Sequence, residues 1–420
     1  MDDTDKQTLG KQFARGSAMG SMALATGYLA QYLFQVSVSR VLGAEAAGTL
    51  FIAFAFVLLV SIVARLGLDK TGLKVVSAWF SRGRLDNIRE VTLLLSLLAG
   101  LASVPVMAIV FFSRAGLAEL ISLPQDKLTV IIICLSIPLV AVSLIFAEVL
   151  RGMRLVGLSS IVQLVAPYGM AITFIWSAAF LGGATLHTGA LAFISGYALS
   201  MLLGSYFIFK STTTCNAPLF SHYPEVVRGA PAMLWSALIL FGIAGGEVII
   251  LGYFVPGNEV AYYFAASRTA MLISVSMVGI NSIVIPMIAS AFRENNTTHL
   301  GHIARLGARL SLTIAAFFTG FLLIGGEQVL SLFGRGFEGS FLLLLILLAG
   351  QLVNSAVGAV AFIMFMSGQE KHAARILTLI ITVMLFLYVI AIPALGIKGA
   401  ALVTAAGVAA WNVGMMKSIY

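Results

Sequence analysis

The chain has 420 residues, of which 60% are hydrophobic and only 10% are charged, and its formal net charge is +8. Soluble domains are about 25% charged and about 45–50% apolar. The composition therefore excludes an ordinary water-soluble enzyme, a disordered chain and a nucleic-acid-binding domain. Its two cysteines are too few for a disulfide framework. These values predict a polytopic membrane protein.

Twelve stretches are long and apolar enough to cross a hydrocarbon core, which takes about 20 residues per helix. They run over 18–38, 47–64, 91–112, 128–150, 158–181, 189–209, 232–255, 262–289, 307–325, 341–366, 376–393 and 399–416. A transmembrane barrel is excluded because its strands are about ten residues long and alternate apolar with polar residues. We therefore expect an all-α membrane protein. The first stretch is too long for a signal peptide and should remain as a membrane helix.

Lysine and arginine predict the orientation, because they are enriched in the cytoplasmic loops of membrane proteins. With the N-terminus inside, the inner segments hold nineteen cations, the outer segments hold five, and Arg268 lies within a span. Both termini are therefore expected in the cytoplasm. The basic inner loop over 65–90 is expected to contain a surface helix around 73–80, whose Trp79-Phe80 pair suits the headgroup interface.

The second half of the chain resembles the first. Gly43-Ala-Glu45-Ala-Ala aligns with Gly257-Asn-Glu259-Val-Ala, and other weak similarities follow in the same order. Six helices per half give both halves the same orientation, which is a parallel repeat around a central cavity and is typical of transporters. Chance similarity among apolar helices is the alternative. The predicted parts are an N-terminal lobe (1–210), a cytoplasmic linker (211–230) and a C-terminal lobe (231–420).

Two ionisable residues lie within predicted spans, where a charge is costly unless it faces a polar cavity or a partner. Glu247 follows Gly245-Gly246, which either loosen the seventh span or form a packing seam. At 1.5 Å per residue, Glu247 and Arg268 lie about 13 Å and roughly 9 Å from the outer turn. They are expected to face one interior, either as a self-neutralising pair or as working groups. In the second case Arg268 grips a phosphate through two hydrogen bonds and Glu247 binds a proton or cation.

Further charges lie at the edges of the spans. Arg40 closes the first span on the outer side. Arg65, Asp69 and Lys70 lie where the second span meets the cytoplasm. These residues are either solvated anchors and helix-stabilising pairs or, for the last three, a cytoplasmic mouth that receives an anionic headgroup.

Two more pairs allow two interpretations each. Glu148 and Arg151 are spaced i, i+3 at the end of the fourth span, as a helix-stabilising pair would be. Gln31 and Gln35 share one face of the first span and either line the cavity or pair with neighbouring helices. No phosphate loop, nucleophile elbow or clustered metal-ligand motif is present, so we expect no enzyme, no cofactor and no metal.

Several motifs resemble one family. The run 40–48 resembles the turn after helix one of polysaccharide flippases, and 247–254 with 259–268 resembles the hallmark stretch of their helices seven and eight. Pro286, 333–337 and 396–401 extend the similarity to the C-terminal end. The chain thus resembles the O-antigen or exopolysaccharide flippases of the multidrug/oligosaccharidyl-lipid/polysaccharide exporter superfamily. It departs from them in having Glu247 where Asp is common, and in having few cations within its spans.

This resemblance implies two lobes around a cationic cavity in a bacterial inner membrane. The charge of that cavity would come from Arg268 and from the arginines at the span edges, so Arg40 and Arg65 are also candidate substrate-binding residues. It implies an undecaprenyl-diphosphate-linked oligosaccharide as the substrate. The expected partners are membrane lipids and other polysaccharide-assembly proteins, without nucleic acid, and transport is either passive or coupled to a proton or sodium gradient. A drug/cation antiporter of the same superfamily, with Glu247 as its coupling carboxylate, is one alternative. A membrane-embedded glycan polymerase or ligase is another, against which the short outer loops argue.

Overall fold

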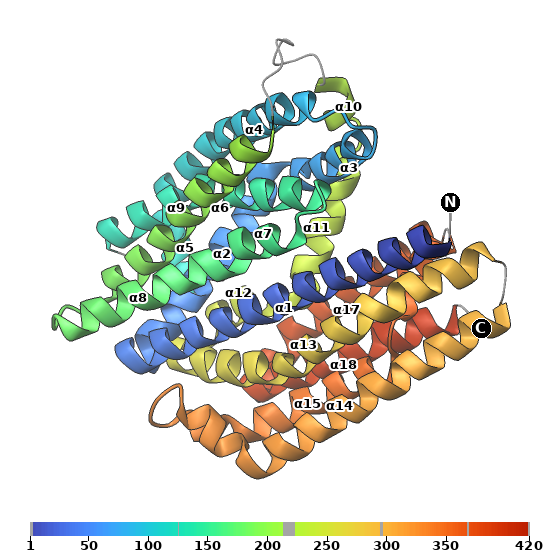
Figure 1. Cartoon of the computed structure of the whole chain (residues 1–420). Helices are drawn as coiled ribbons and strands as arrows, with labels where there is room; N and C mark the ends of the chain where they lie inside the picture. The colour runs from blue at the N-terminus through green and yellow to red at the C-terminus, as the bar shows by residue number, and fades with distance from the viewer. Residues whose placement is uncertain (1–2, 125, 213–222, 295–296, 368, 419–420) are drawn as a thin grey trace. The chain divides into compact units, whose positions relative to one another are not determined.

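The computed structural model describes residues 3–124, 126–212, 223–294, 297–367 and 369–418, and every regular element within them is a helix (Figure 1). This confirms the all-α prediction. The elements are α1 (Asp3–Leu42), α2 (Ala44–Arg65), α3 (Leu68–Phe80), α4 (Asp86–Phe112), α5 (Arg114–Ile121), α6 (Lys127–Gly152), α7 (Val156–Ser160), η1 (Ile161–Val165), α8 (Ala166–Phe180), α9 (Leu186–Ser211), α10 (Tyr223–Val227), α11 (Ala230–Ala244), α12 (Glu247–Phe254), α13 (Gly257–Arg293), α14 (Thr297–Ser331), η2 (Phe337–Ser340), α15 (Phe341–Val357), α16 (Val360–Met366), α17 (Glu370–Leu395) and α18 (Ile397–Lys417).

The expected spans reappear as helices. In the described chain, ten helical segments are long and apolar enough to cross a membrane, and α11 with α12 makes an eleventh that is bent by 55°. These eleven correspond to the second through twelfth expected spans. The first expected span lies within α1, which is outside this set and whose apolar run is interrupted by Gln31 and Gln35. The protein is therefore a multi-pass helical membrane protein.

The surface has the character that a lipid environment requires. Phe180, Ile324 and Phe112 are 93%, 88% and 80% exposed, respectively. In water, exposed apolar side chains of this size promote association with other molecules. In a membrane they contact the apolar lipid chains instead.

The chain divides into two compact units, each described separately. Unit 1 contains Met1–Tyr28 and Tyr262–Tyr420, and unit 2 contains Leu29–Ala261. Helices α1 and α13 therefore contribute residues to both. The lobes over 1–210 and 231–420 are defined by the sequence repeat, a different criterion, and that division stays a prediction.

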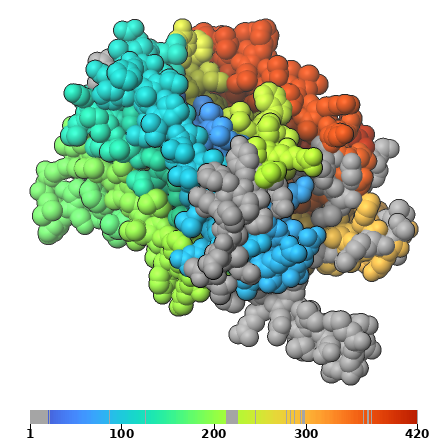
Figure 2. Space-filling model, turned by 90° about the horizontal axis from the view of Figure 1, so that it is seen from above, coloured from blue at the N-terminus to red at the C-terminus, as the bar shows by residue number. Residues whose placement is uncertain are grey.

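In unit 2, α6 is the central helix and contacts α2, α3, α4 and α9. Figure 2 shows the chain turned by 90° about the horizontal axis, with its side chains filled in. The amphipathic helix α3 begins earlier than expected, at Leu68, and places Val76 and Trp79 in a core cluster with Leu150 of α6. Trp79 is only 5% exposed. The prediction that this tryptophan lies at the headgroup interface is therefore wrong, because the apolar face of α3 packs on α6 instead of on lipid.

In unit 1, α18 packs between α15 and α17, and α14 packs on α15. Two buried tyrosines form hydrogen bonds to one threonine of this bundle. The hydroxyls of Tyr263 and Tyr388 lie 2.7 and 2.8 Å from Thr404 Oγ1. One hydroxyl of α18 thus joins α13 to α17, which is how polar groups connect helices in a membrane.

Candidate functional site

Glu247 lies at a break in a membrane-spanning helix. α11 ends at Ala244, two glycines follow, and α12 begins at Glu247. Gly245 and Gly246 both donate their backbone N–H to Phe241 O, which ends the ladder of α11. Of the two alternatives for these glycines, a packing seam or a loosened helix, the structure has the loosened helix, with a bend of 55° between α11 and α12. The Glu247 side chain is 2% exposed, and its place in the first turn of α12 favours a carboxylate, because the N-terminus of a helix carries partial positive charge.

Arg268 is half-buried on α13 in unit 1. Its guanidinium carbon lies 4.5 Å from the centre of the Phe264 ring, and Nη1 donates to Met271 Sδ at 3.2 Å. Its Nε is buried and has no acceptor among the described residues of this unit. A buried unmatched donor costs free energy that an anionic acceptor would recover. Because Glu247 belongs to unit 2, the expected proximity of the two charges stays a prediction.

Arg65 and Asp69 form a buried ion pair at the corner between α2 and α3. Nη1 lies 3.1 Å from Asp69 Oδ2, and the side chains are 9% and 6% exposed. Arg65 Nε also donates to Ser61 O. The corner forms because Leu66 and Gly67 adopt left-handed φ values of 54° and 77°, which turn the chain so that the first turn of α3 returns to the end of α2.

Gly67 has a second role at this corner. A Cβ atom there would lie 2.2 Å from Ala230 O and 2.6 Å from Leu234 N. Only a glycine therefore permits both the left-handed conformation and the close approach of the corner to α11.

Glu148 of α6 joins two cations from different parts of the chain. Its Oε1 lies 2.7 Å from Lys70 Nζ and 2.9 Å from Arg151 Nη1. Arg151 Nη2 donates to Gln163 Oε1 at 2.5 Å. Gln163 lies on the π-helical turn η1, a distortion that is frequent at functional sites. The Glu148 side chain is 6% exposed, whereas those of Lys70 and Arg151 are 38% and 30% exposed.

This arrangement unites two features that the sequence shows separately. The expected mouth (Arg65, Asp69, Lys70) and the pair Glu148–Arg151 meet through the bond from Lys70 to Glu148. Three cations and two carboxylates leave one net positive charge. Because two accessible cations converge on one oxygen, the cluster presents the donors that a phosphate group accepts.

Arg40 lies away from this cluster. It is exposed in the last turn of α1, next to the start of α2, whereas Arg65 ends α2. At 1.5 Å per residue the length of α2 separates them by about 30 Å.

The turn motif after α1 serves a close helix contact. A Cβ atom on Gly48 would lie 1.7 Å from Gly257 O, and one on Gly257 would lie 2.9 Å from Glu45 O. The two segments aligned by the internal repeat therefore touch each other through their glycines. Gly43, which the repeat aligns with Gly257, has a different role, because its φ is 81° and a Cβ atom there would meet nothing within 4 Å.

Two polar clusters join helices, and sequence reasoning pointed to Gln31 of the first but missed the second. In unit 2, Gln31 Nε2 donates to the hydroxyl of Tyr168 at 3.0 Å, so Gln31 pairs with a neighbouring helix, the second of its two alternatives. In unit 1, Gln351 Oε1 accepts from Ser274 Oγ at 2.7 Å, and Asn412 Nδ2 donates to Asn354 Oδ1 at 2.9 Å. The available signal was a single amide within an apolar run, which any helix-packing residue also produces.

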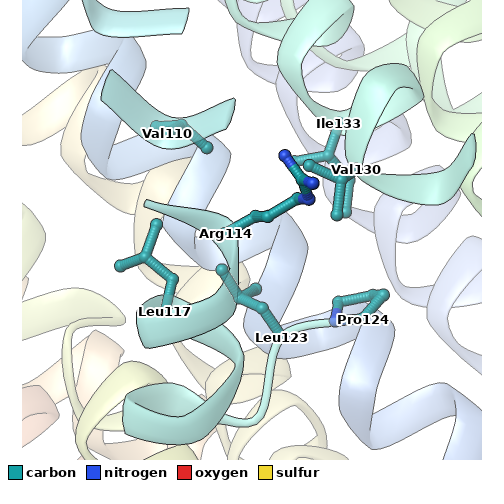
Figure 3. Close-up of a pocket in the computed structure, with 7 residues that line it drawn as sticks. All are labelled: Val110, Arg114, Leu117, Leu123, Pro124, Val130 and Ile133. Atoms are coloured by element: carbon teal, nitrogen blue, oxygen red, sulfur yellow. The ribbon is translucent and has the colours of Figure 1, made fainter. Parts of the chain in front are cut away.

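A small pocket surrounds Arg114 near the starts of α5 and α6 (Figure 3). The arginine extends between Leu123 and Val130 in a lining that is otherwise apolar. Its guanidinium carbon lies 4.9 Å from the centre of the Phe111 ring, and Nη1 donates to Phe111 O at 3.2 Å. These contacts fit an anchor at the membrane boundary, where arginine buries its stem and keeps its charge near water.

Comparisons with known proteins agree with this architecture. A family model described as "Polysaccharide biosynthesis protein" matches residues 13–292. No curated protein matches the chain significantly. An inward-facing multidrug resistance transporter of the MATE family and MOP superfamily is similar with a TM-score of 0.71 at 15% identity, over 96% of this chain and 97% of that chain.

Two further solved structures are similar over nearly their whole lengths. A MATE transporter from Vibrio cholerae has a TM-score of 0.67 at 15% identity, covering 97% of this chain and 96% of that chain. A MOP superfamily transporter from Pyrococcus furiosus has a TM-score of 0.63 at 14% identity, covering 97% and 95%. At these identities the similarity shows the fold.

The chain therefore has the fold of the multi-pass membrane transporters of the MOP (multidrug/oligosaccharidyl-lipid/polysaccharide) exporter superfamily, and a family model matches two thirds of its length. Within that superfamily the chain belongs to the polysaccharide biosynthesis protein family. This confirms the predicted resemblance to the polysaccharide flippases.

Proposed function

We propose that the protein flips an undecaprenyl-diphosphate-linked oligosaccharide from the inner to the outer leaflet of a bacterial inner membrane, for O-antigen, exopolysaccharide or capsule synthesis. The observation that carries the proposal is a polysaccharide-biosynthesis family match on a chain with a transporter fold. A transporter in that process moves a glycan or its lipid-linked precursor. Transport proceeds by alternating access, with both termini in the cytoplasm, and makes or breaks no covalent bond, so the protein is not an enzyme.

Three cations are assigned to the diphosphate. Lys70 and Arg151 receive it at the cytoplasmic mouth, where it competes with Glu148 for both donors. Arg268 then holds it within the membrane, with the buried Nε as the donor that lacks an acceptor in unit 1. A guanidinium stays charged and offers a planar fork that matches phosphate oxygens.

Glu247 is assigned to coupling. A buried carboxylate beside a break in a spanning helix suits the binding of a proton or sodium ion, because interrupted helices expose backbone groups to such ions. Binding and release at this point would change the bend between α11 and α12.

A drug/cation antiporter is the second candidate, favoured by the same buried Glu247 and by the similarity to MATE transporters. Such a protein would use Glu247 to exchange an ion for a cationic drug. Its substrate would carry charge opposite to that of a diphosphate, so the two candidates differ in what the cations on α3, α6 and α13 do.

Reconstituted vesicles separate these candidates. The full chain is inserted into vesicles that contain a labelled lipid-diphosphate oligosaccharide, and leaflet exchange is followed with and without proton and sodium gradients. The proposal predicts exchange well above that of protein-free vesicles and no ethidium efflux. Ethidium efflux without lipid exchange would establish the antiporter instead.

A further inference from the structure

A basic pocket lies on α14, and none of its residues is among those assigned to transport. His302, Arg305 and Arg309 line it together with Leu306, and it holds about 140 Å³ of space. A water occupies about 30 Å³, so the pocket has room for a phosphate group. The four residues share one helix face because they are spaced by three, four and seven positions, and all four are exposed.

No carboxylate among the described residues pairs with the arginines of this pocket. Neither Arg305 nor Arg309 forms an ion pair in the part of the chain that the structure describes. Arg305 Nε donates to Gly301 O at 3.0 Å, which fixes the side chain and leaves both Nη atoms for another acceptor.

The pocket lies on the outward face of α14. The opposite face carries Ile303, which packs in a core cluster with Val284 and Ile363, and Gly307, where a Cβ atom would lie 3.0 Å from Val284. Figure 1 shows α14, in orange, at the edge of unit 1 beside α15.

Along α14, the face that carries the pocket continues as a row of exposed apolar side chains. Leu306 and Leu310 are each 47% exposed, and further along the helix Phe317 and Ile324 are 73% and 88% exposed. α14 has 35 residues, about 50 Å at 1.5 Å each, and is therefore longer than the hydrocarbon core of about 30 Å. Its apolar stretch begins near residue 307, which places Arg305 and Arg309 at headgroup level.

We propose that this pocket binds the headgroup phosphate of an anionic membrane phospholipid. The two guanidinium groups hold the phosphate oxygens, and Leu306 and Leu310 contact the upper acyl chains. Charge selects the lipid, because cationic side chains at the membrane surface attract anionic headgroups. The lipid is a resident of the membrane and not the cargo, so the inference is independent of the proposed transport function.

Native mass spectrometry of the detergent-solubilised full chain, titrated with phosphatidylglycerol, tests the proposal. In R305A/R309A the affinity should fall about thirtyfold, which equals the loss of about 1 kcal/mol for each cation at 1.4 kcal/mol per factor of ten. The matched control K371A/R375A removes two exposed cations from α17 of the same unit and should bind as the wild type does.

Further arms identify the ligand. Phosphatidylcholine and inorganic phosphate should both bind the wild type much more weakly than phosphatidylglycerol, because the first lacks net negative charge and the second lacks acyl chains. R305K/R309K keeps both charges and should retain most of the affinity, which separates loss of charge from a folding defect. Equal phosphatidylglycerol affinity in R305A/R309A and the wild type, or equal affinity of the wild type for phosphatidylcholine or phosphate, would overturn the proposal.

Discussion

Arg65 and Asp69 are both nearly inaccessible, and each side chain lies against the opposite charge of the other. Replacing one partner of a buried pair leaves an uncompensated charge and costs about 3–5 kcal/mol. We therefore expect Asp69→Asn to lower the thermal unfolding temperature of the detergent-solubilised protein markedly. The exposed Glu119→Gln removes the same charge from the surface and should leave that temperature unchanged. Similar temperatures for both variants would show that the pair contributes little.

Lys70 and Arg151 differ from this pair, because they remain partly accessible while sharing Glu148. If they capture the headgroup before translocation, Arg151→Ala should raise the lipid concentration that gives half-maximal exchange severalfold and leave the maximal rate nearly unchanged. This follows because interactions that bind substrate and transition state equally affect KM and not kcat. Arg82→Ala, at an exposed cation between α3 and α4, is the control. A fall in the maximal rate alone would place Arg151 in the translocation step.

The contact between Gly48 and Gly257 brings the start of α2 against the start of α13. A Cβ atom on Gly48 would overlap Gly257 O at 1.7 Å, and backbone atoms cannot move aside as a flexible side chain can. Overpacking of this kind costs about 1–3 kcal/mol or more. We expect Gly48→Ala to reduce the folded yield and the unfolding temperature.

The control for this contact is Gly100→Ala in α4, where a Cβ atom would meet nothing within 4 Å. It should be neutral or slightly stabilising, because alanine favours a helix over glycine. Equal losses in the two variants would mean that glycine content, and not the contact, matters.

The break between α11 and α12 can be tested by replacing its two glycines. Two alanines at Gly245 and Gly246 favour a continuous helix by about 1 kcal/mol each. If the bend changes during transport, Gly245→Ala/Gly246→Ala should slow exchange while the unfolding temperature is maintained or raised. Gly320→Ala in α14, where a Cβ atom meets nothing, should leave the rate unaltered. Undiminished exchange in the double variant would show that the bend is not used.

Elements were predictable to different degrees. The spans follow from the length of apolar runs, and the break at Gly245-Gly246 follows from local helix propensity. The burial of Trp79 does not, because an amphipathic helix has the same pattern whether its apolar face meets lipid or another helix. Likewise, the bond between Lys70 and Glu148 joins residues 78 positions apart, and only tertiary packing determines such a pair.

At the scale of the whole molecule, the family and the transporter fold were predictable because their motifs recur along the entire chain. The distance between Glu247 and Arg268, by contrast, could not be predicted from the sequence. The sequence places both at similar depth, but they belong to different compact units. The proximity of the two charges therefore stays a prediction.

The central claim is that Arg268 holds the lipid diphosphate during translocation, and leaflet exchange in reconstituted vesicles tests it most directly. Hydrogen bonds to charged groups contribute about 1.5–3 kcal/mol, so Arg268→Ala should slow exchange about tenfold to a hundredfold at normal protein levels. Arg268→Lys should be intermediate, and Arg335→Ala, at an exposed cation of the same unit, should exchange normally. Wild-type rates in Arg268→Ala, or rates at the protein-free level in the wild type itself, would contradict the account.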